Sequence, residues 1–154
     1  MLSVALVLLL LAVFWAGYDS GQSEERKTEG LRVLEAQMSV TSLRQAITNF
    51  FSAYGRWPCG TNRTVDYTFG PGTQKEVIDA LLGLDKSLNP MSKNFLVSFP
   101  KSYRGGEIVD PWTNTIYITL DLNNDGRCHT LRWGIVDTNG PLVWSETLGP
   151  IKSW

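Results

Sequence analysis

At 154 residues, the chain is long enough for one compact domain and a helical extension. Its 14 basic and 15 acidic side chains give a formal net charge of -1, so the sequence offers no broad basic surface for a phosphate backbone, which disfavours nucleic-acid binding. The 19% of charged residues and the six tryptophans are typical of a folded domain and exclude a largely disordered chain.

Residues 1–18 predict a membrane-embedded helix, because Val4–Trp15 is an uninterrupted apolar run and no charge occurs before Asp19. A helix that spans a bilayer needs roughly 20 apolar residues, so the length of this run is borderline. A cleaved signal peptide is the alternative, since Ala16 and Gly17 are small. The lack of a basic residue ahead of the run favours a retained anchor. In both cases the rest of the chain is expected to be exported.

A long amphipathic helix is expected after this segment. Residues 19–32 are polar and charge-rich, and form either a linker or a solvated continuation of the first helix. Apolar residues then recur at alternating steps of three and four, which predicts a helix of about 22 residues with one apolar stripe. Gly55 and Pro58 end this helix. The stripe consists of Val33, Ala36, Val40, Leu43, Ile47, Phe50 and Tyr54.

A second, short helix is expected to begin near Thr73. The run Thr73-Gln74-Lys75-Glu76 has the spacing of a capping box, in which the hydroxyl accepts from the third amide and the carboxylate reaches back to the first. Gly83 ends the helix. Its buried face is predicted to contain Val77, Ile78, Leu81 and Leu82.

Further along the chain, the pattern is typical of short strands. They are expected at Phe95–Phe99, Ile116–Leu120, Leu131–Val136 and Leu142–Trp144. The last two flank Asp137-Thr138-Asn139-Gly140, a hairpin turn signal. A helix followed by antiparallel strands predicts an α+β fold, in which residues 33–154 form a globular domain and the long N-terminal helix packs on a small antiparallel sheet.

Three phrases of the sequence are similar to those of a known family. The long helix ends in Tyr54-Gly55-Arg56-Trp57-Pro58, Val109–Tyr117 contains Asp-Pro-Trp followed by Asn, and the chain closes with Val143-Trp144-Ser145 and Ile151–Trp154. In this order they resemble the major pseudopilin of type II secretion systems, a member of the type IV pilin-like superfamily. The resemblance covers nearly the whole chain.

The resemblance implies a pilin-like fold and a role as structural subunit of a type II secretion pseudopilus or a related pilus-like assembly, without enzymatic activity or catalytic residues. It implies a bacterial single-pass inner-membrane protein whose globular domain lies in the periplasm. The implied partners are other pseudopilins, the secretion machinery and the inner membrane. No nucleic acid, small-molecule substrate or required cofactor is expected.

The chain departs from the family at three places. The family's short basic leader is not seen ahead of the apolar run, and Ala5 stands where the family normally has a glutamate. The acidic C-terminal calcium loop of the family corresponds to Ser145–Pro150, which holds one carboxylate, so calcium binding is not expected there. The first two departures favour an alternative function: a stand-alone periplasmic binding module, membrane-anchored or secreted, with a pilin-like fold.

A different segment matches part of a calcium-binding motif. Asp121-Leu122-Asn123-Asn124-Asp125-Gly126 matches the first half of a calcium-binding loop, in which oxygens at alternate positions converge on one hard cation. The second half fails, because Arg132 stands where the bidentate glutamate is needed. Asn and Asp also favour plain turns, so both interpretations remain. A calcium ion would be held by Asp121, Asn123, Asp125 and the carbonyl of Arg127.

Catalytic and zinc chemistry have little support in the sequence. Cys59 and Cys128 are the two cysteines and His129 is the single histidine, which disfavours a zinc site within one chain. Neither cysteine lies in a recognisable nucleophile motif. In an oxidising compartment the two cysteines are expected to form a disulfide with each other, if the fold brings them within bonding distance.

Overall fold

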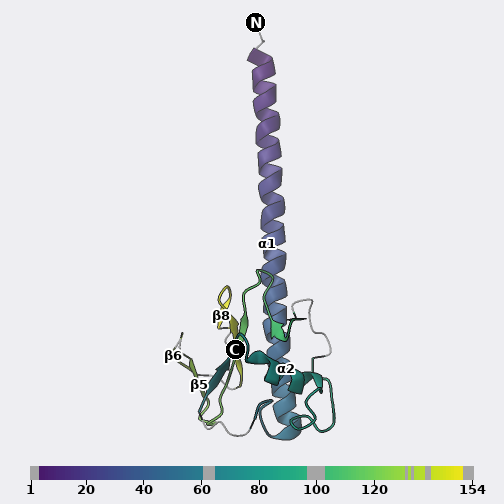
Figure 1. Ribbon diagram of the computed structural model, residues 1–154. Helices are drawn as coiled ribbons and strands as arrows, with labels where there is room; N and C mark the ends of the chain where they lie inside the picture. The colour runs from purple at the N-terminus through teal and green to yellow at the C-terminus, as the bar shows by residue number, and fades with distance from the viewer. Residues whose placement is uncertain are drawn as a thin grey trace. The chain divides into compact units, whose positions relative to one another are not determined.

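The computed structural model describes residues 4–60, 65–96, 103–130, 132, 134–137 and 140–150, and for residues 4–24, 104, 149 and 150 it describes the backbone alone. The chain divides into two compact units, Met1–Leu34 and Glu35–Trp154. Helix α1, Val4–Tyr54, contributes residues to both (Figure 1). The sequence predicts either a linker or a helix for residues 19–32, and the structure shows that they are helical.

The first unit contains residues 4–34 of α1, and its described side chains, from residue 25 onward, are exposed except for that of Val33. Leu31 and Leu34 are 66% and 52% exposed, whereas Val33 is half-buried. Arg32 forms an ion pair with Glu29 at 3.8 Å, the spacing of neighbours on a helix surface. Since no side chain among residues 25–34 is buried, this stretch contributes no core packing.

Residues 35–54 of α1 bury the stripe that the sequence predicts, which confirms the helix and its orientation. The helix ends at Gly55, whose amide donates to the Phe51 carbonyl at 2.7 Å and whose φ of 65° is strained for any residue with a side chain. Tyr54 is half-buried at this end. The stripe residues with at most 1% exposure are Ala36, Val40, Leu43, Ile47 and Phe50.

The second unit is built on a four-stranded antiparallel sheet in the order β1-β4-β7-β8, so the fold is α+β, as predicted. Its strands are β1 (Tyr67–Phe69), β4 (Ile116–Leu120), β7 (Leu142–Ser145) and β8 (Gly149–Pro150). Two hairpins accompany it: β2 (Tyr103–Arg104) with β3 (Glu107–Ile108), and β5 (Arg127–Thr130) with β6 (Gly134–Asp137). In the central strand, Ile118 lies opposite both Phe69 and Val143.

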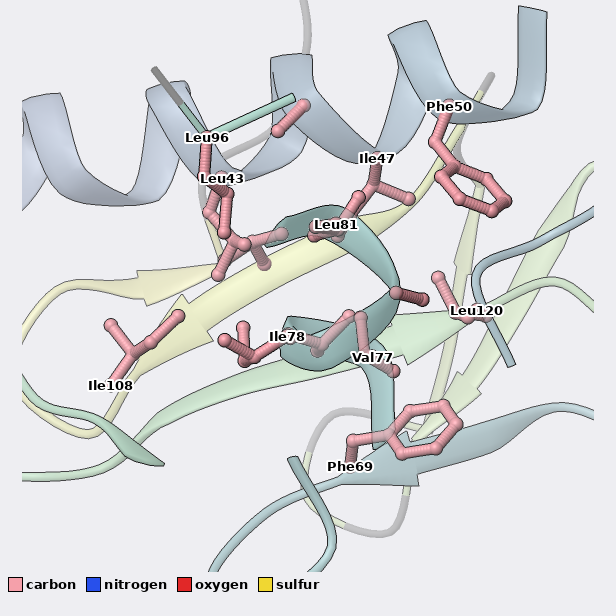
Figure 2. Packing of buried hydrophobic residues seen from close by; sticks show 14 of the residues in the cluster. Leu43, Ile47, Phe50, Phe69, Val77, Ile78, Leu81, Leu96, Ile108 and Leu120 are labelled. Atoms are coloured by element: carbon pink, nitrogen blue, oxygen red, sulfur yellow. The ribbon is translucent and has the colours of Figure 1, made fainter. Parts of the chain in front are cut away.

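Two separate clusters of buried residues lie against this sheet. The large cluster joins α1, α2 and one face of the sheet, and Figure 2 shows Leu43, Ile47 and Phe50 pointing into it from α1. Each fully buried side chain of this kind contributes about 1.5–3 kcal/mol. Because side chains alternate along a strand, Tyr117 and Thr119 of β4 and Leu142 and Trp144 of β7 face the other way. There the β5–β6 hairpin covers a small cluster of Cys128, Val136, Leu142 and Trp144, with Tyr117 packed against it.

The hairpin predicted between Leu131–Val136 and Leu142–Trp144 is wrong. Strand β6 pairs with β5, and β7 pairs with β4 and β8. The physical reason is burial, because all four residues of β7 are buried. Val143 belongs to the large cluster, and its neighbours Leu142 and Trp144 belong to the small one. A strand covered on both faces belongs inside the main sheet. Residues 138 and 139 of the predicted turn lie outside the described part of the chain.

The strand predicted at Phe95–Phe99 is also not found where the chain is described. Phe95 and Leu96 belong to no strand, and residues 97–99 lie outside the described ranges. Phe95 instead packs its ring 5.3 Å from that of Phe50, and its amide donates to the Leu81 carbonyl at 2.8 Å. The Phe95 side chain therefore packs against the core, although its backbone belongs to no strand.

Helix α2, Gln74–Leu82, confirms the predicted short helix, but the predicted capping box is wrong. The Thr73 hydroxyl instead exchanges hydrogen bonds with the backbone of Gly70, at 2.9 and 3.1 Å, and so is not available to the helix amides. The Glu76 carboxylate accepts from the amide of Gly60 at 2.6 Å. The Thr73 hydroxyl is therefore engaged in a local turn, and the Glu76 carboxylate is engaged by a distant backbone amide.

The segment after α2 is held close to the helix at two residues, Gly83 and Asn89. Gly83 has a φ of 78°, and a Cβ there would lie 2.6 Å from the main chain of Ser92, so no other residue fits without a backbone shift. Asn89, which is fully buried, accepts from the Tyr54 hydroxyl at 2.6 Å and donates to the Ala80 carbonyl at 2.8 Å. One amide side chain thus joins the end of α1 to α2.

Candidate functional site

The candidate calcium loop connects β4 to β5 and is held by its own backbone. The Asp121 carboxylate accepts from the amides of Asp125 and Gly126, at 3.2 and 2.9 Å. The Asn123 side-chain oxygen accepts from the same Asp125 amide at 3.0 Å. These are the contacts that Asp and Asn make in plain turns.

Asp125 and Arg127 complete the same pattern. The Asp125 carboxylate accepts from the Arg127 amide at 2.9 Å and from the Asn123 side-chain amide at 3.1 Å, while His129 Nε2 lies 3.7 Å away. Within the described ranges, no group of three or more His, Cys, Asp or Glu is placed to hold a metal ion. The turn interpretation therefore accounts for these contacts without an ion, and the calcium site at Asp121, Asn123, Asp125 and Arg127 stays a prediction.

Asp66 is a residue of this loop region that the sequence gave no reason to single out. It precedes β1, yet its two carboxylate oxygens accept from the amides of Leu122 and His129, at 3.1 and 2.8 Å. Asp66 thus clamps both ends of the β4–β5 connection from the neighbouring strand. No short sequence motif predicts such a contact, because Asp66 and its two partners are far apart along the chain.

The two cysteines lie in different clusters, and the structure carries both as thiols. Cys59 is 4% exposed in the large cluster, and Cys128 is fully buried in the small one. Burial raises the pKa of the Cys128 thiol to about 12, and its sulfur lies 3.7 Å from the Thr119 carbonyl oxygen. The Cys59–Cys128 disulfide stays a prediction, and the intact mass of alkylated protein with and without reductant tests it.

The segment that resembles the family's Asp-Pro-Trp phrase has a structural role in the fold. The Asp110 carboxylate is 2% exposed and accepts from the amides of Trp112 and Asn114, at 3.0 and 2.8 Å. It also accepts from the Thr147 hydroxyl at 2.8 Å, which ties this turn to the β7–β8 turn. A buried carboxylate needs such donors, so these contacts explain the phrase without any ligand.

A cleft lies beside the exit of α1. We call it the Trp57 cleft and define it by Phe51, Arg56, Trp57, Cys59, Leu122 and Asn124, which line a cavity of about 440 Å³ together with Gly55 and Gly60. A second cavity of about 260 Å³ shares Phe51, Trp57 and Asn124 with it. Trp57 Nε1 donates to the Asp121 carbonyl at 2.8 Å, and the Trp57 ring lies 4.4 Å from that of Phe51. The indole is therefore fixed between the two cavities.

The predicted membrane helix falls on residues whose backbone alone is described. Residues 4–18 are helical, while residues 1–3 lie outside the described part. Across the part of the chain that the structure describes, no helix combines the length and the apolar character needed to cross a membrane. Membrane insertion of residues 1–18 stays a prediction.

Comparison of the chain with models of protein families, with curated proteins and with solved structures found no match.

Proposed function

We propose that this chain is a structural subunit of a type II secretion pseudopilus or a related pilus-like assembly, and that it acts in protein secretion by packing. The observation that carries the proposal is helix α1, which runs without a break from Val4 to Tyr54 and buries the stripe of its C-terminal part against a small antiparallel sheet. A long helix combined with a small sheet domain is the arrangement that the resemblance implies.

Exposed apolar side chains on α1 support a packing role. Leu31, Leu34 and Met38 are 66%, 52% and 62% exposed, and they are spaced three and four residues apart. Scattered exposed apolar residues are ordinary, but apolar residues at helical spacing are typical of a helix that packs against a partner. In this proposal the partners are the helices of other pseudopilins.

The N-terminal part of α1 is expected to enter a mixed fibre through partners and not to assemble alone. Association within a bilayer depends on close packing and polar contacts, because lipid is as apolar as leucine. The segment Leu2–Val13 is rich in Leu and Val, and its small residues are Ser3, Ala5 and Ala12. Without the family's glutamate, this segment offers few such contacts.

Disulfide crosslinking in membranes tests the proposal. Single cysteines at Val4 or Leu8 are expected to crosslink to other pseudopilins when the secretion machinery is present. A cysteine at Ser42, on the exposed side of α1, serves as the matched control, and the native Cys59 and Cys128 are buried. Efficient self-crosslinking without the machinery contradicts the dependence on partners. The absence of any crosslink to a pseudopilin in its presence contradicts the assembly role.

The second candidate function is a stand-alone periplasmic binding module, membrane-anchored or secreted, and the Trp57 cleft favours it. Its larger cavity, about 440 Å³, is in the usual size range of small-molecule sites and is lined by aromatic and apolar groups with a few polar ones. Carbonate extraction of membranes and reporter fusions at Gly30 separate an anchored module from a released one. A module that stands alone also fails the crosslinking test above.

A further inference from the structure

We propose that the Trp57 cleft binds a carboxylate that carries a flat apolar or aromatic group, either a free small acid or the C-terminal end of a peptide. The cleft lies entirely within the second unit, and its residues come from the end of α1, the exit segment after it and the β4–β5 loop. The inference goes beyond the assembly role and is independent of it.

The apolar wall of the cleft is preformed. Trp57 is held in one orientation by its hydrogen bond to the Asp121 carbonyl at 2.8 Å and by its contact with the Phe51 ring. Leu122, which is half-buried and packs at the border of the large cluster, adds an aliphatic surface. A wall that needs no reordering lowers the entropic cost of binding, and flat rings stack well on it.

The charge of the cleft comes from Arg56. Its Nη2 donates to the carbonyls of Ser87 and Leu88, at 3.1 and 2.9 Å, which anchors one side of the guanidinium. In the described part of the chain, Nε and Nη1 of this side chain form no hydrogen bond or ion pair. A guanidinium fixed on one side presents its remaining donors in the geometry that suits a carboxylate.

A carboxylate whose charge is coupled to Arg56, that of Asp85, is engaged elsewhere. Asp85 accepts from the Ser87 hydroxyl at 2.6 Å and from the amides of Ser87 and Leu88. The hydrogen bond from Ser87 and, more weakly, the charge of Arg56 hold the pKa of Asp85 below its usual value. Among the described residues Asp85 forms no ion pair with Arg56, so Nε and Nη1 of Arg56 are open to a ligand carboxylate.

Asn124 supplies a second polar contact at the place where the two cavities meet. Its backbone is left-handed, with a φ of 57°, and it lines both cavities with an exposed side chain. Within the described residues, the Asn124 side chain has no hydrogen-bond partner. A primary amide in this position can donate to a ligand carboxylate or amide, which fixes the orientation of the ligand.

The first experiment titrates the full chain in detergent with indole-3-acetate and, as the uncharged control of the same shape, indole-3-acetamide. The readout is the indole N–H resonance of Trp57, assigned with Trp57→Phe. The acid is expected to shift this resonance and to bind at least about tenfold more tightly than the amide, the usual effect of a charge-assisted hydrogen bond. Equal binding of acid and amide overturns the proposal, as does a Trp57 resonance that neither indole-3-acetate nor the carboxylate peptide of the second arm shifts.

A second arm separates the two sources of the ligand. The dipeptide N-acetyl-Ala-Trp is compared with its C-terminal amide. If the carboxylate peptide binds and indole-3-acetate does not, the ligand is a chain end. If indole-3-acetate binds as tightly as the carboxylate peptide, the ligand is a free acid. Either result supports the carboxylate chemistry. Since the crosslinking test measures assembly, failure of this binding test leaves the proposed function standing.

Two variants test the residue assignments. Arg56→Gln removes the charge and is expected to weaken indole-3-acetate binding about tenfold, with binding of the amide unchanged. Because Arg56 also supports the Ser87 and Leu88 carbonyls, Asn124→Asp provides an independent test: Asp tolerates the left-handed backbone and repels an acid. Arg132→Gln, at an exposed arginine paired with Glu146, is the control. Unchanged binding in both Arg56→Gln and Asn124→Asp contradicts the proposal.

Discussion

The two faces of the four-stranded sheet are covered in different ways. On one face, α1 and α2 lay down a continuous aliphatic and aromatic cluster, in which Phe50 and Phe69 are the largest fully buried side chains. On the other, the β5–β6 hairpin covers four buried residues, and Tyr117 stacks on Trp144 at 4.3 Å. The large cluster thus has many mutually supporting contacts, whereas the small one depends on a single short hairpin.

This difference predicts an unequal distribution of stability. Burial of apolar area contributes in proportion to the area removed from water, so the helix-covered face dominates the free energy of unfolding. The hairpin-covered face is expected to open first, because regions with few buried apolar contacts open at lower free energy. The following substitutions test this comparison in order of expected effect.

Phe50→Ala is expected to have the largest effect. The Phe50 side chain is fully buried, and its ring lies 4.7 Å from Tyr54 and 5.3 Å from Phe95. Its truncation leaves a cavity and is expected to lower the free energy of unfolding by about 3–5 kcal/mol. Urea denaturation followed by circular dichroism measures the loss. Met38→Ala, at an exposed position of the same helix, is the control with an expected effect within about 0.5 kcal/mol.

A matched pair of valines compares the two faces directly. Val143 is fully buried in the large cluster and Val136 is 8% exposed in the small one. We expect Val143→Ala to cost about 2 kcal/mol and Val136→Ala about 1 kcal/mol, because a well-packed site collapses less around a lost group. Urea denaturation of both variants provides the comparison. A larger loss for Val136→Ala reverses the proposed order of the two faces.

The Cys128 thiol makes the stability of the hairpin-covered face depend on pH. Its pKa is about 12 in the fold against an ordinary value of 9.0, so above pH 9 the unfolded chain releases this proton while the folded chain keeps it. Stability is therefore complete below pH 9 and falls as the pH rises toward 12, by about 1 kcal/mol per pH unit. Urea denaturation under reducing conditions at pH 8, 9 and 10 measures the slope. Cys128→Ala is expected to flatten it, and an unchanged slope contradicts the assignment.

Calcium is expected to have the smallest effect. The turn interpretation of Asp121–Gly126 predicts the same melting temperature in millimolar calcium and in chelator, because the loop oxygens already accept hydrogen bonds from its amides. An ion that binds the folded chain alone raises the melting temperature. A rise that Asp121→Asn abolishes establishes the calcium site and rejects the plain turn.

The predictability of the fold from sequence follows the same division. The stripe of α1 and the end at Gly55 depend on local periodicity and local backbone geometry, and both were correct. Strand β4 was predicted with its observed bounds, since its β-branched run is flanked by turn residues. The partner of β7 was not predictable in this way, because strand pairing is decided by which distant strand completes the burial of both faces.

The candidate sites show the same limit. The spacing of Asp121, Asn123 and Asp125 identified a turn-forming loop, but the clamp from Asp66 crosses between strands and leaves no local signal. The Trp57 cleft is likewise assembled from the helix exit and the β4–β5 loop, which are about 65 residues apart. Sequence patterns identify such residues singly, and only the fold shows that they line one cavity.

The close approach of Gly83 to Ser92 has a consequence for ancestry. A Cβ at position 83 would lie 2.6 Å from the Ser92 main chain. A related chain that keeps this close approach of the two backbone segments must therefore keep glycine there, whichever other positions change. Asn89, six positions later, is bound almost as tightly by its partners on α1 and α2. A glycine followed six residues on by asparagine is therefore expected in any related chain that keeps this close approach.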